Sequence, residues 1–346
     1  MAMTSTISAS QELDAPNRSG EPLLSVRDLQ VHFPLKRGFI VQREVARVKA
    51  VDGVSFDIYP GETLGLVGES GSGKTTAAKA VIQLNNPGNG SVKFEGQELV
   101  GLSSSAMRPV RRKMGMVFQD PYGSLNPRMR AGDIVGEPLK VHGLADSRDD
   151  YREQVSSLLT TVGLSPAMAE RYPNEFSGGQ RQRLGVARAI AARPSLLILD
   201  ESVSALDVSI QAQILNLLQD LQDQYNLAYL FIAHDLSVVR HISHRVAVMY
   251  LGKIVETADA KDLYERPLHP YTQALLSAIP TPNPVHERSR ERIILRGDLP
   301  SPLDPPPGCG FSTRCPIATD ICSQSVPELR TLAPNQQAAC LLAQGD

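Results

Sequence analysis

A glycine-rich segment, GESGSGKT at residues 68–75, is the feature that most restricts how this chain can fold. It fits the pattern G-x-x-x-x-G-K-[ST], follows the apolar run TLGLV and precedes the helical pattern KTTAAKAVIQL. In a strand–loop–helix unit of this kind, backbone N–H groups turn toward phosphate oxygens and the helix N-terminus adds positive potential. We expect Lys74 to reach the β- and γ-phosphates and the Thr75 hydroxyl to bind Mg²⁺. The expected nucleotide-binding residues of this segment are Gly68, Glu69, Ser70, Gly71, Ser72, Gly73, Lys74, Thr75 and Thr76.

The apolar pattern along the chain predicts an α/β fold. Short buried runs (TLGLV, MGMVF, LLILD and AYLFIA) alternate with stretches of helical period, which indicates parallel strands covered by helices. Between residues 121 and 176 the strand patterns stop and helical patterns such as YREQVSSLLTTVGL replace them, so we expect a helical insertion there. A length of 346 residues allows one large core and an appended module.

The N-terminus and the overall charge restrict location and partners. Residues 1–22 are polar with almost no large apolar side chains, so we expect a disordered lead. The chain has no secretory leader pattern and no run of 18 apolar residues, which indicates a cytosolic protein. Lys and Arg number 35 against 37 Asp and Glu, so no global basic character favours nucleic acid, and we expect no such partner.

A second chemical element is SLLILDES, residues 195–202, an apolar strand that ends in two carboxylates. Apolar strands that end in solvated acids are common, so this pattern alone is a weak signal. It becomes a strong signal for a catalytic site because it follows a phosphate loop in the sequence. Asp200 is expected to hold Mg²⁺, directly or through water, and Glu201 to polarise the attacking water as a general base.

The most specific stretch is YPNEFSGGQRQR, residues 172–183. A helix that begins directly after Ser177 with two glycines is an anion site without an anion of its own, because the phosphate loop lies elsewhere in the sequence. It must therefore meet a phosphate from another source.

Here the sequence resembles the ATP-binding subunits of ABC transporters, whose SGGQ signature it matches at Ser177, Gly178, Gly179 and Gln180. The resemblance implies that the signature of one subunit closes on the γ-phosphate held by another, in a head-to-tail dimer. It also implies a P-loop ABC-type nucleotide-binding domain at 23–257, with a mixed sheet core, an antiparallel edge sheet and a helical subdomain at about 121–176.

Other positions match the family in order. The resemblance assigns Gln119 to the glutamine loop, which contacts Mg²⁺ and the attacking water, and His234 to the switch histidine near the γ-phosphate. It assigns Asp207, in SALD at 204–207, to the dimer interface. Two positions depart from the pattern: Ser202 replaces the usual proline, and Val45 stands where many relatives stack adenine on an aromatic ring.

The resemblance extends to the oligopeptide and dipeptide importers, and most to the second of their two ATPase subunits. Three stretches carry it: QDPYGSLNPRMR, SALDVSIQAQILNLL and LHPYTQALLSAIP, and it covers residues 24–343. It implies a cytoplasmic-face ATPase that powers peptide import, with a second ABC ATPase in a heterodimer, two membrane permease subunits and, indirectly, an extracytoplasmic binding protein. Nickel or glycoside import is the alternative within the subgroup.

The C-terminal extension, residues 258–346, contains all four cysteines of the chain: Cys309, Cys315, Cys322 and Cys340. Disulfides seldom persist in the cytosol, and four thiolates are a full ligand set for zinc or for a four-iron four-sulfur cluster. The spacing C-x5-C-x6-C-x17-C lacks the paired knuckles of zinc folds, and the resemblance implies an iron–sulfur cluster. Zinc and unliganded thiols are the alternatives.

Two other functions compete with the importer interpretation. A soluble ABC ATPase that acts on nucleic acid or the ribosome usually has two cassettes or a long coiled-coil insertion, and this chain has one cassette and a short insertion. A regulatory subunit without hydrolysis would lack catalytic residues, whereas Lys74, Glu201 and His234 are all present.

Overall fold

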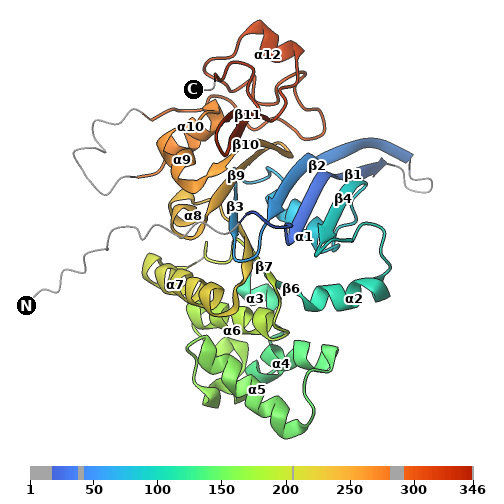
Figure 1. Ribbon diagram of the computed structural model, residues 1–346, viewed down its shortest axis with the longest axis vertical. Coiled ribbons are helices and arrows are strands. Elements are labelled where there is room, and N and C mark those ends of the chain that lie inside the picture. Colours follow the sequence, from blue (N-terminus) through green and yellow to red (C-terminus); the bar gives the residue numbers. More distant parts are fainter. Residues whose placement is uncertain (1–17, 38–42, 205, 281–291, 345–346) are drawn as a thin grey trace, which may run out of the picture.

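The structure is a computed structural model that describes residues 18–37, 43–204, 206–280 and 292–344. Two β-sheets lie in the middle of the molecule in Figure 1, the red C-terminal segment lies above them, and helices form the lower end. The strands are β1 (Leu24–Arg37), β2 (Arg43–Ile58), β3 (Thr63–Val67), β4 (Asn89–Phe94), β5 (Gln97–Glu98), β6 (Met114–Val117), β7 (Leu196–Asp200), β8 (Ala228–Ile232), β9 (Arg245–Tyr250), β10 (Lys253–Asp259), β11 (Arg330–Ala333) and β12 (Gln336–Ala338). The α-helices are α1 (Lys74–Val81), α2 (Ser104–Arg112), α3 (Pro121–Ser124), α4 (Ala131–His142), α5 (Arg148–Thr161), α6 (Gly178–Ile190), α7 (Val208–Tyr225), α8 (Leu236–Ile242), α9 (Ala260–Glu265), α10 (Pro270–Ser277) and α12 (Asp320–Gln324), and the 3-10 helices are η1 (Pro166–Glu170) and η2 (Pro173–Glu175).

The main sheet confirms the expected mixed core. Within the described residues its strand order is β11-β12-β10-β9-β3-β8-β7-β6. Strands β9, β3, β8, β7 and β6 are parallel, and β10, β12 and β11 continue the sheet with antiparallel pairing. All four apolar runs that the sequence pattern identified are strands of the parallel part.

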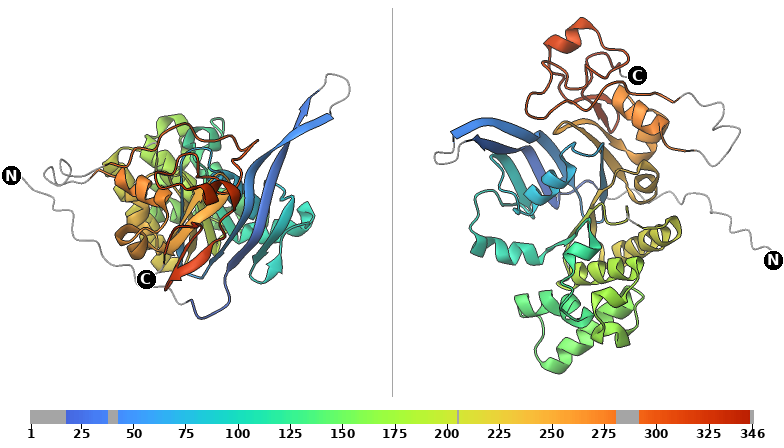
Figure 2. Two further views of the ribbon diagram at one scale, coloured as in Figure 1. Left: turned by 90° about the horizontal axis from the view of Figure 1, so that it is seen from above. Right: turned by 180° about the vertical axis from the view of Figure 1, so that it is seen from behind.

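A second sheet, with the order β2-β1-β4-β5, is antiparallel and is the expected edge sheet. Its strands β1 and β2 form a long pair that extends beyond the rest of the sheet (Figure 2). Helix α1 packs against β1 and β2 on one side and against β7 and β8 on the other. The helix that begins at the phosphate loop is therefore held between the two sheets.

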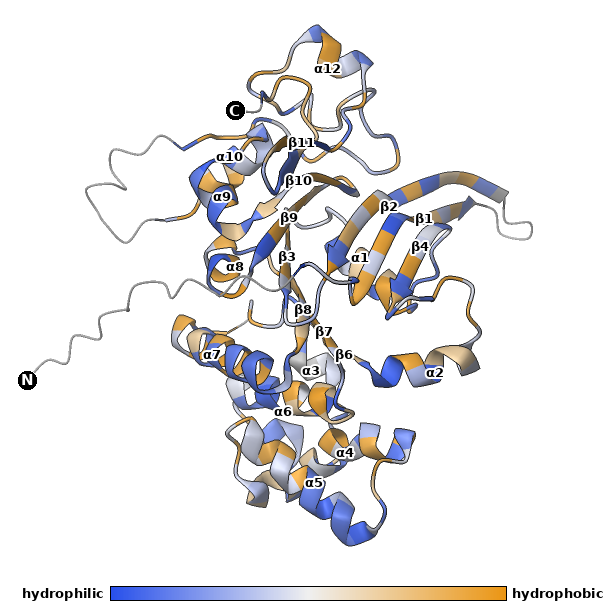
Figure 3. Ribbon diagram, viewed as in Figure 1, coloured by the Kyte–Doolittle hydropathy of each residue, from blue (hydrophilic) through white to orange (hydrophobic). Residues whose placement is uncertain are grey.

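Alternate side chains of the parallel strands enter two different cores, as the period of two in a strand requires. In β8, Leu230 and Ile232 belong to the core that contains α1 and the second sheet. Tyr229 and Phe231 belong to the larger core beneath the helices on the opposite face. Figure 3 shows the resulting hydrophobic colouring along the central strands. Because both faces are covered, these strands are apolar throughout instead of alternating.

Residues 121–176, all of them described, contain α3, α4, α5, η1 and η2 and no strand. Helices α4 and α5 both pack against α6, and together they form the lower end of the molecule in Figure 1. None of the helices in the described part of the chain is long and apolar enough to cross a membrane.

The expected N-terminal lead is described only from Arg18 onward, and residues 1–17 lie outside the described residues. The Arg18 guanidinium forms ion pairs with Asp259 at 2.6 Å and with Glu62, which is fully buried, at 3.3 Å. The last residues of the lead are therefore attached to the base of β3 and the end of β10.

The C-terminal extension continues the main sheet. The boundary expected between residues 257 and 258 falls inside β10, and β12 pairs with β10 through Glu256 and Thr257. The buried Glu256 carboxylate accepts hydrogen bonds from the backbone N–H groups of Leu268 and His269, both at 2.8 Å, and from the Gln336 side chain at 3.0 Å. One carboxylate thus joins β10, the start of α10 and β12.

Phe311 anchors the first cysteine-containing loop to the end of β9. Its side chain is 2% exposed. Its ring lies 5.2 Å from the ring of Tyr250, 5.4 Å from Tyr271 and 5.6 Å from His269, measured between centroids. Edge-on and tilted aromatic contacts of this kind add to the free energy gained by burial.

We predict that Phe311→Ala lowers the free energy of unfolding by about 3–5 kcal/mol, because it removes a buried ring and leaves a cavity. Phe33→Ala makes the same chemical change on a side chain that is 41% exposed, and it serves as the matched control. Urea unfolding followed by circular dichroism measures both. Equal losses in the two variants would contradict the assignment of Phe311 as the anchor.

Candidate nucleotide-binding site

The phosphate loop between β3 and α1 has two positions that require glycine. Gly68 has φ +151° and Gly73 has φ +105°, which are values that side-chain-bearing residues rarely adopt. A Cβ at Gly68 would lie 2.1 Å from the carbonyl oxygen of Met249, and one at Gly73 would lie 2.1 Å from that of Ala50. The loop is therefore pressed against the end of β9 and against β2.

Lys74 lies over this loop with its side chain almost fully buried. Its ammonium group donates hydrogen bonds to the carbonyl oxygens of Gly68 at 2.8 Å and Glu69 at 2.9 Å, and to the Ser72 hydroxyl at 3.4 Å. Burial lowers the pKa of Lys74, and the nearby carboxylates of Glu201, Asp200 and Glu69 oppose that shift. A partly desolvated ammonium group at this place is suited to bind phosphate oxygens.

Thr75 and Asp200 bring two oxygen ligands together. The Thr75 hydroxyl, at the start of α1, donates a 2.8 Å hydrogen bond to the carboxylate of Asp200, the last residue of β7. Burial raises the pKa of Asp200, and the hydrogen bond from Thr75 opposes that rise. A hydroxyl and a carboxylate side by side are the hard oxygen donors that Mg²⁺ takes together with phosphates and water, so this pair fits the ion.

The expected catalytic side chains meet beside this pair. Gln119 donates a 2.7 Å hydrogen bond to Oε2 of Glu201, and Nδ1 of His234 lies 3.7 Å from the same oxygen. Glu201 has φ +45°, and its N–H is fixed by a 2.9 Å hydrogen bond to the carbonyl of Ile232. A residue other than glycine held in the left-handed region is a strain that functional sites often contain.

The sheet explains this convergence. The phosphate loop follows β3, Gln119 follows β6, Glu201 follows β7 and His234 follows β8. Because β6, β7, β8 and β3 are neighbouring parallel strands, their carboxyl ends lie at one edge of the sheet, where ligands bind in open α/β sheets.

The signature segment lies at the start of α6 and does not complete this site within the chain. Ser177 and Gln180 form a capping box: the Ser177 hydroxyl accepts from the N–H of Gln180 at 3.3 Å, and the Gln180 side chain accepts from the N–H of Ser177 at 3.0 Å. A Cβ at Gly179 would lie 2.5 Å from the Ile210 side chain of α7. No hydrogen bond or ion pair found for the described residues joins residues 177–180 to the phosphate loop.

Three further positions were singled out in the sequence. Asp207, whose side chain is exposed, precedes α7 without a side-chain hydrogen bond to that helix, and Ala205 of the same loop lies outside the described residues. Val45 is 59% exposed on β2, so its expected contact with adenine stays a prediction. Ser202 is buried, and its hydroxyl has no hydrogen-bond partner among the described residues.

Two contacts of the phosphate loop were missed by the sequence reasoning. The N–H of Glu69 donates a 2.9 Å hydrogen bond to the hydroxyl of Tyr271 in α10. The Glu69 carboxylate forms an ion pair with Arg314, between the first two cysteines, at 2.9 Å. Both contacts join residues far apart in the sequence, by 202 and 245 positions, so no local pattern indicates them.

The four cysteines are free thiols of the C-terminal extension, whose last part is the red ribbon at the top of Figure 1. The N–H of Cys309 donates a 2.7 Å hydrogen bond to the carbonyl of Cys322, which brings the first and third cysteines together in the backbone. Burial raises the pKa of the Cys309 and Cys315 thiols, and the neighbouring cysteines raise it further. Within the described residues, no group of three or more His, Cys, Asp or Glu side chains is placed to hold a metal ion, so the metal assignment stays a prediction.

The fold and this site together define an ATP-binding cassette of the ABC type. The ABC transporter family model matches residues 51–204, and the model for the C-terminal region of oligopeptide/dipeptide transporters matches residues 255–322. The dimeric post-hydrolysis structure of the cassette MJ0796 bound to ADP and phosphate aligns with a TM-score of 0.61 at 26% identity, covering 68% of this chain and 98% of that one.

Two curated relatives show which group within the ABC transporter family this chain is similar to. The oligopeptide transport ATP-binding protein AppF of Bacillus subtilis is 54% identical over 323 residues, which cover 93% of this chain and 98% of the relative. The oligopeptide transport ATP-binding protein OppF of Salmonella typhimurium is 52% identical over 308 residues, which cover 89% and 92%. The chain belongs to the oligopeptide-transport ATP-binding proteins of the ABC transporter family.

We predict that Gly73→Ala abolishes measurable binding of a fluorescent ATP analogue, because its Cβ would collide with the carbonyl of Ala50. Gly96→Ala is the matched control: Gly96 also has a positive φ, of +76°, but its Cβ would meet nothing within 4 Å. The control should lose about 1 kcal/mol of stability through backbone strain and keep its affinity. Normal binding by Gly73→Ala would show that the loop geometry is not what the nucleotide needs.

Proposed function

We propose that this chain is the ATP-hydrolysing subunit of an ABC importer for peptides. The observation that carries the proposal is the meeting of Lys74, the Thr75–Asp200 pair and Glu201 at one edge of the sheet. Support for the transported solute comes from the relatives, which are named as oligopeptide transport proteins. Nickel or glycoside import remains the alternative for the solute.

In this proposal the loop residues 68–76 bind the phosphates of ATP through their backbone N–H groups, and the Lys74 ammonium group exchanges its carbonyl partners for β- and γ-phosphate oxygens. Thr75, Asp200 and Gln119 would hold Mg²⁺, whose charge offsets that of the phosphates. Val45 is the position assigned to the adenine.

Glu201 is assigned to orient and polarise the attacking water, since it follows Asp200 at the end of β7 and its carboxylate lies between Gln119 and His234. Gln119 donates a hydrogen bond to that carboxylate, so a movement of Gln119 would directly change the position of the group that binds the attacking water. His234 lies near the same oxygen and is assigned to the γ-phosphate side of the site.

The signature helix is proposed to serve the nucleotide of another subunit. The N–H groups of Gly178 and Gly179 lie at the positive end of α6, while Ser177 and Gln180 cap each other and keep that end rigid. Asp207 is assigned to the interface, and the partner's signature would complete this chain's own site. The dimeric cassette among the similar structures supports this arrangement. We propose a heterodimer with a second ABC ATPase.

Closure of the dimer on ATP is proposed to drive two permease subunits at the cytoplasmic face of the membrane, and hydrolysis with phosphate release to reopen it. ATP can shift the equilibrium only by its higher affinity for the closed state. The permease subunits and an extracytoplasmic binding protein would select the peptide. Nucleic acid has no part in this proposal.

We also propose that Cys309, Cys315, Cys322 and Cys340 ligate a four-iron four-sulfur cluster. Support comes from the donor set alone: four free thiols are the full number of ligands that such a cluster needs, and all four belong to the C-terminal extension, although the structure does not gather their side chains into a metal-binding group within the described residues. Such a cluster would hold the extension folded, as metal ligation does in small domains. Zinc is the alternative ligand.

We expect Glu201→Gln to keep its ATP affinity within a few-fold and to lose about 10²–10⁴ of the hydrolysis rate, the usual contribution of a general base. Phosphate release measures the rate, and a fluorescent analogue measures the affinity. Glu153→Gln, the same substitution on the exposed outer face of α5, is the matched control and should keep the rate. Hydrolysis at the normal rate by Glu201→Gln would remove Glu201 as the base.

For the cysteine module, iron, acid-labile sulfide and zinc are to be measured per chain after purification without oxygen. About four irons with equal sulfide are expected. Cys315→Ser should lower the iron content, and Ser312→Ala, in the same loop, should not. Zinc alone, or no metal at all, would refute the cluster assignment.

A further inference from the structure

Arg314 connects the C-terminal module to the phosphate loop. Its Nη1 lies 2.9 Å from Oε2 of Glu69 and its Nη2 lies 3.2 Å from Oε1, which is a bidentate guanidinium–carboxylate pair. The Arg314 side chain is 9% exposed and that of Glu69 is 28% exposed. Pairs with two parallel N–H···O contacts are stronger and more directional than single-contact pairs.

The turn that carries Arg314 is fixed from several sides. The N–H of Arg314 donates to the carbonyl of Phe311 at 3.0 Å, and the N–H of Ser312 donates to that of Cys309 at 2.9 Å. Phe311 is buried against Tyr250, whose ring centroid also lies 6.0 Å from the guanidinium of Arg314. Cys309 and Cys315 bracket this turn, so whatever holds their thiols also fixes the position of Arg314.

The same side of the loop meets two more residues of the extension. The Tyr271 hydroxyl accepts from the N–H of Glu69, and a Cβ at Gly71 would lie 3.7 Å from the side chain of Leu299. Tyr271, Leu299 and Arg314 all lie outside the span that the ABC transporter model matches, residues 51–204. One wall of the phosphate loop is therefore formed by the extension and not by the cassette.

The Glu69 carboxylate is a negative charge close to Lys74, and Arg314 pairs with it. Its carbonyl oxygen accepts from Lys74, while its carboxylate is held by Arg314. The Glu69 charge acts on the Lys74 ammonium group. Released from Arg314, this carboxylate would compete with the phosphates of ATP for Lys74, since like and opposite charges within a few ångströms interact strongly when partly desolvated.

We propose that Arg314 is a positioning residue of the nucleotide site: its bidentate pair with Glu69 keeps that carboxylate away from Lys74, so that ATP affinity depends on the folded C-terminal module. The inference rests on the proposed function, because it assumes that ATP binds at Lys74. If it holds, ATP binding requires a residue of the C-terminal extension in addition to the motifs of the cassette.

The test is a double-mutant cycle on the full-length chain, read as the dissociation constant of a fluorescent ATP analogue. Arg314→Gln should weaken binding about fivefold, the scale of a partly exposed ion pair. In the background of Glu69→Gln, which has no carboxylate to release, the same change should cost less than about twofold. The penalty should also shrink at high salt, because the competition is between charges.

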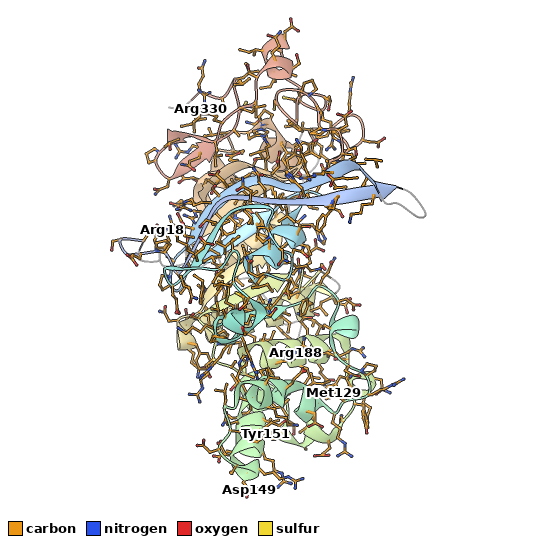
Figure 4. All side chains as sticks on the ribbon, turned by 90° about the vertical axis from the view of Figure 1, so that its right-hand side faces the viewer. Arg18, Met129, Asp149, Tyr151, Arg188 and Arg330 are labelled. Carbon is orange, nitrogen blue, oxygen red and sulfur yellow. The ribbon has the colours of Figure 1, made fainter. Side chains whose placement is uncertain are left out.

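A matched control separates this role from general damage to the module. Arg330→Gln removes another arginine of the extension, whose hydrogen bonds within the described part of the chain go to the carbonyls of Cys340, Leu341 and Ala343. Figure 4 shows Arg330 in the upper part of the molecule, within that extension. This variant should bind ATP within about twofold of the wild type. A loss equal to that of Arg314→Gln would overturn the proposal.

The remaining outcomes are also decisive. Equal costs of Arg314→Gln with and without Glu69 would overturn the proposal, because a structural role is indifferent to Glu69. If Arg314→Gln does not fold, the cycle is run with Arg314→Lys, which keeps the positive charge but cannot make the bidentate pair. A loss of ATP affinity that disappears in the Glu69→Gln background supports the proposal. Losses that simply add refute it. Failure of the wild type to bind ATP, or normal binding by Lys74→Ala, would instead overturn the proposed function itself.

Discussion

The hydrogen bond from the Thr75 hydroxyl to the Asp200 carboxylate is the contact on which the rest of the site depends. It joins the start of α1 to the end of β7, although β8 lies between β3 and β7 in the sheet. To reach Asp200, Thr75 must follow a loop that turns sharply at Gly68 and Gly73, and both turns bring backbone close to backbone. These contacts together fix the positions of the phosphate loop, helix α1 and the end of β7 relative to one another.

The two cores hold that arrangement from opposite sides. Helix α1 is buried between the sheets, so it cannot shift without disturbing both. The extension adds a third support, through the β10–β12 pairing, the Glu256 carboxylate and the aromatic contacts of Phe311. Coupling between the cysteine module and the nucleotide site thus has a continuous physical path through packed side chains. The signature helix is outside this path and faces another subunit in the proposed function.

Local sequence patterns made the parallel core and the phosphate loop predictable. The strands of the parallel core are buried on both faces and so read as continuous apolar runs, and the phosphate loop needs glycines at fixed spacing. Glu201 could be placed because it ends an apolar strand in a chain that has a phosphate loop, whereas His234 could be placed only through the family resemblance. The Arg314–Glu69 pair and the joining of β11 and β12 to the main sheet could not be predicted, because they depend on contacts between residues far apart in the sequence. Ser202 departs from the family, and nothing in the structure explains the change.

The most direct measurement is a structure of the chain bound to a non-hydrolysable ATP analogue and Mg²⁺. The account predicts that the Lys74 ammonium group leaves the carbonyl oxygens of Gly68 and Glu69 for phosphate oxygens, and that the Thr75 hydroxyl and the Asp200 carboxylate stay side by side and hold the ion together, directly or through water. It also predicts that Glu69 remains paired with Arg314. A nucleotide bound elsewhere, or a Lys74 that keeps its present partners, would contradict the account.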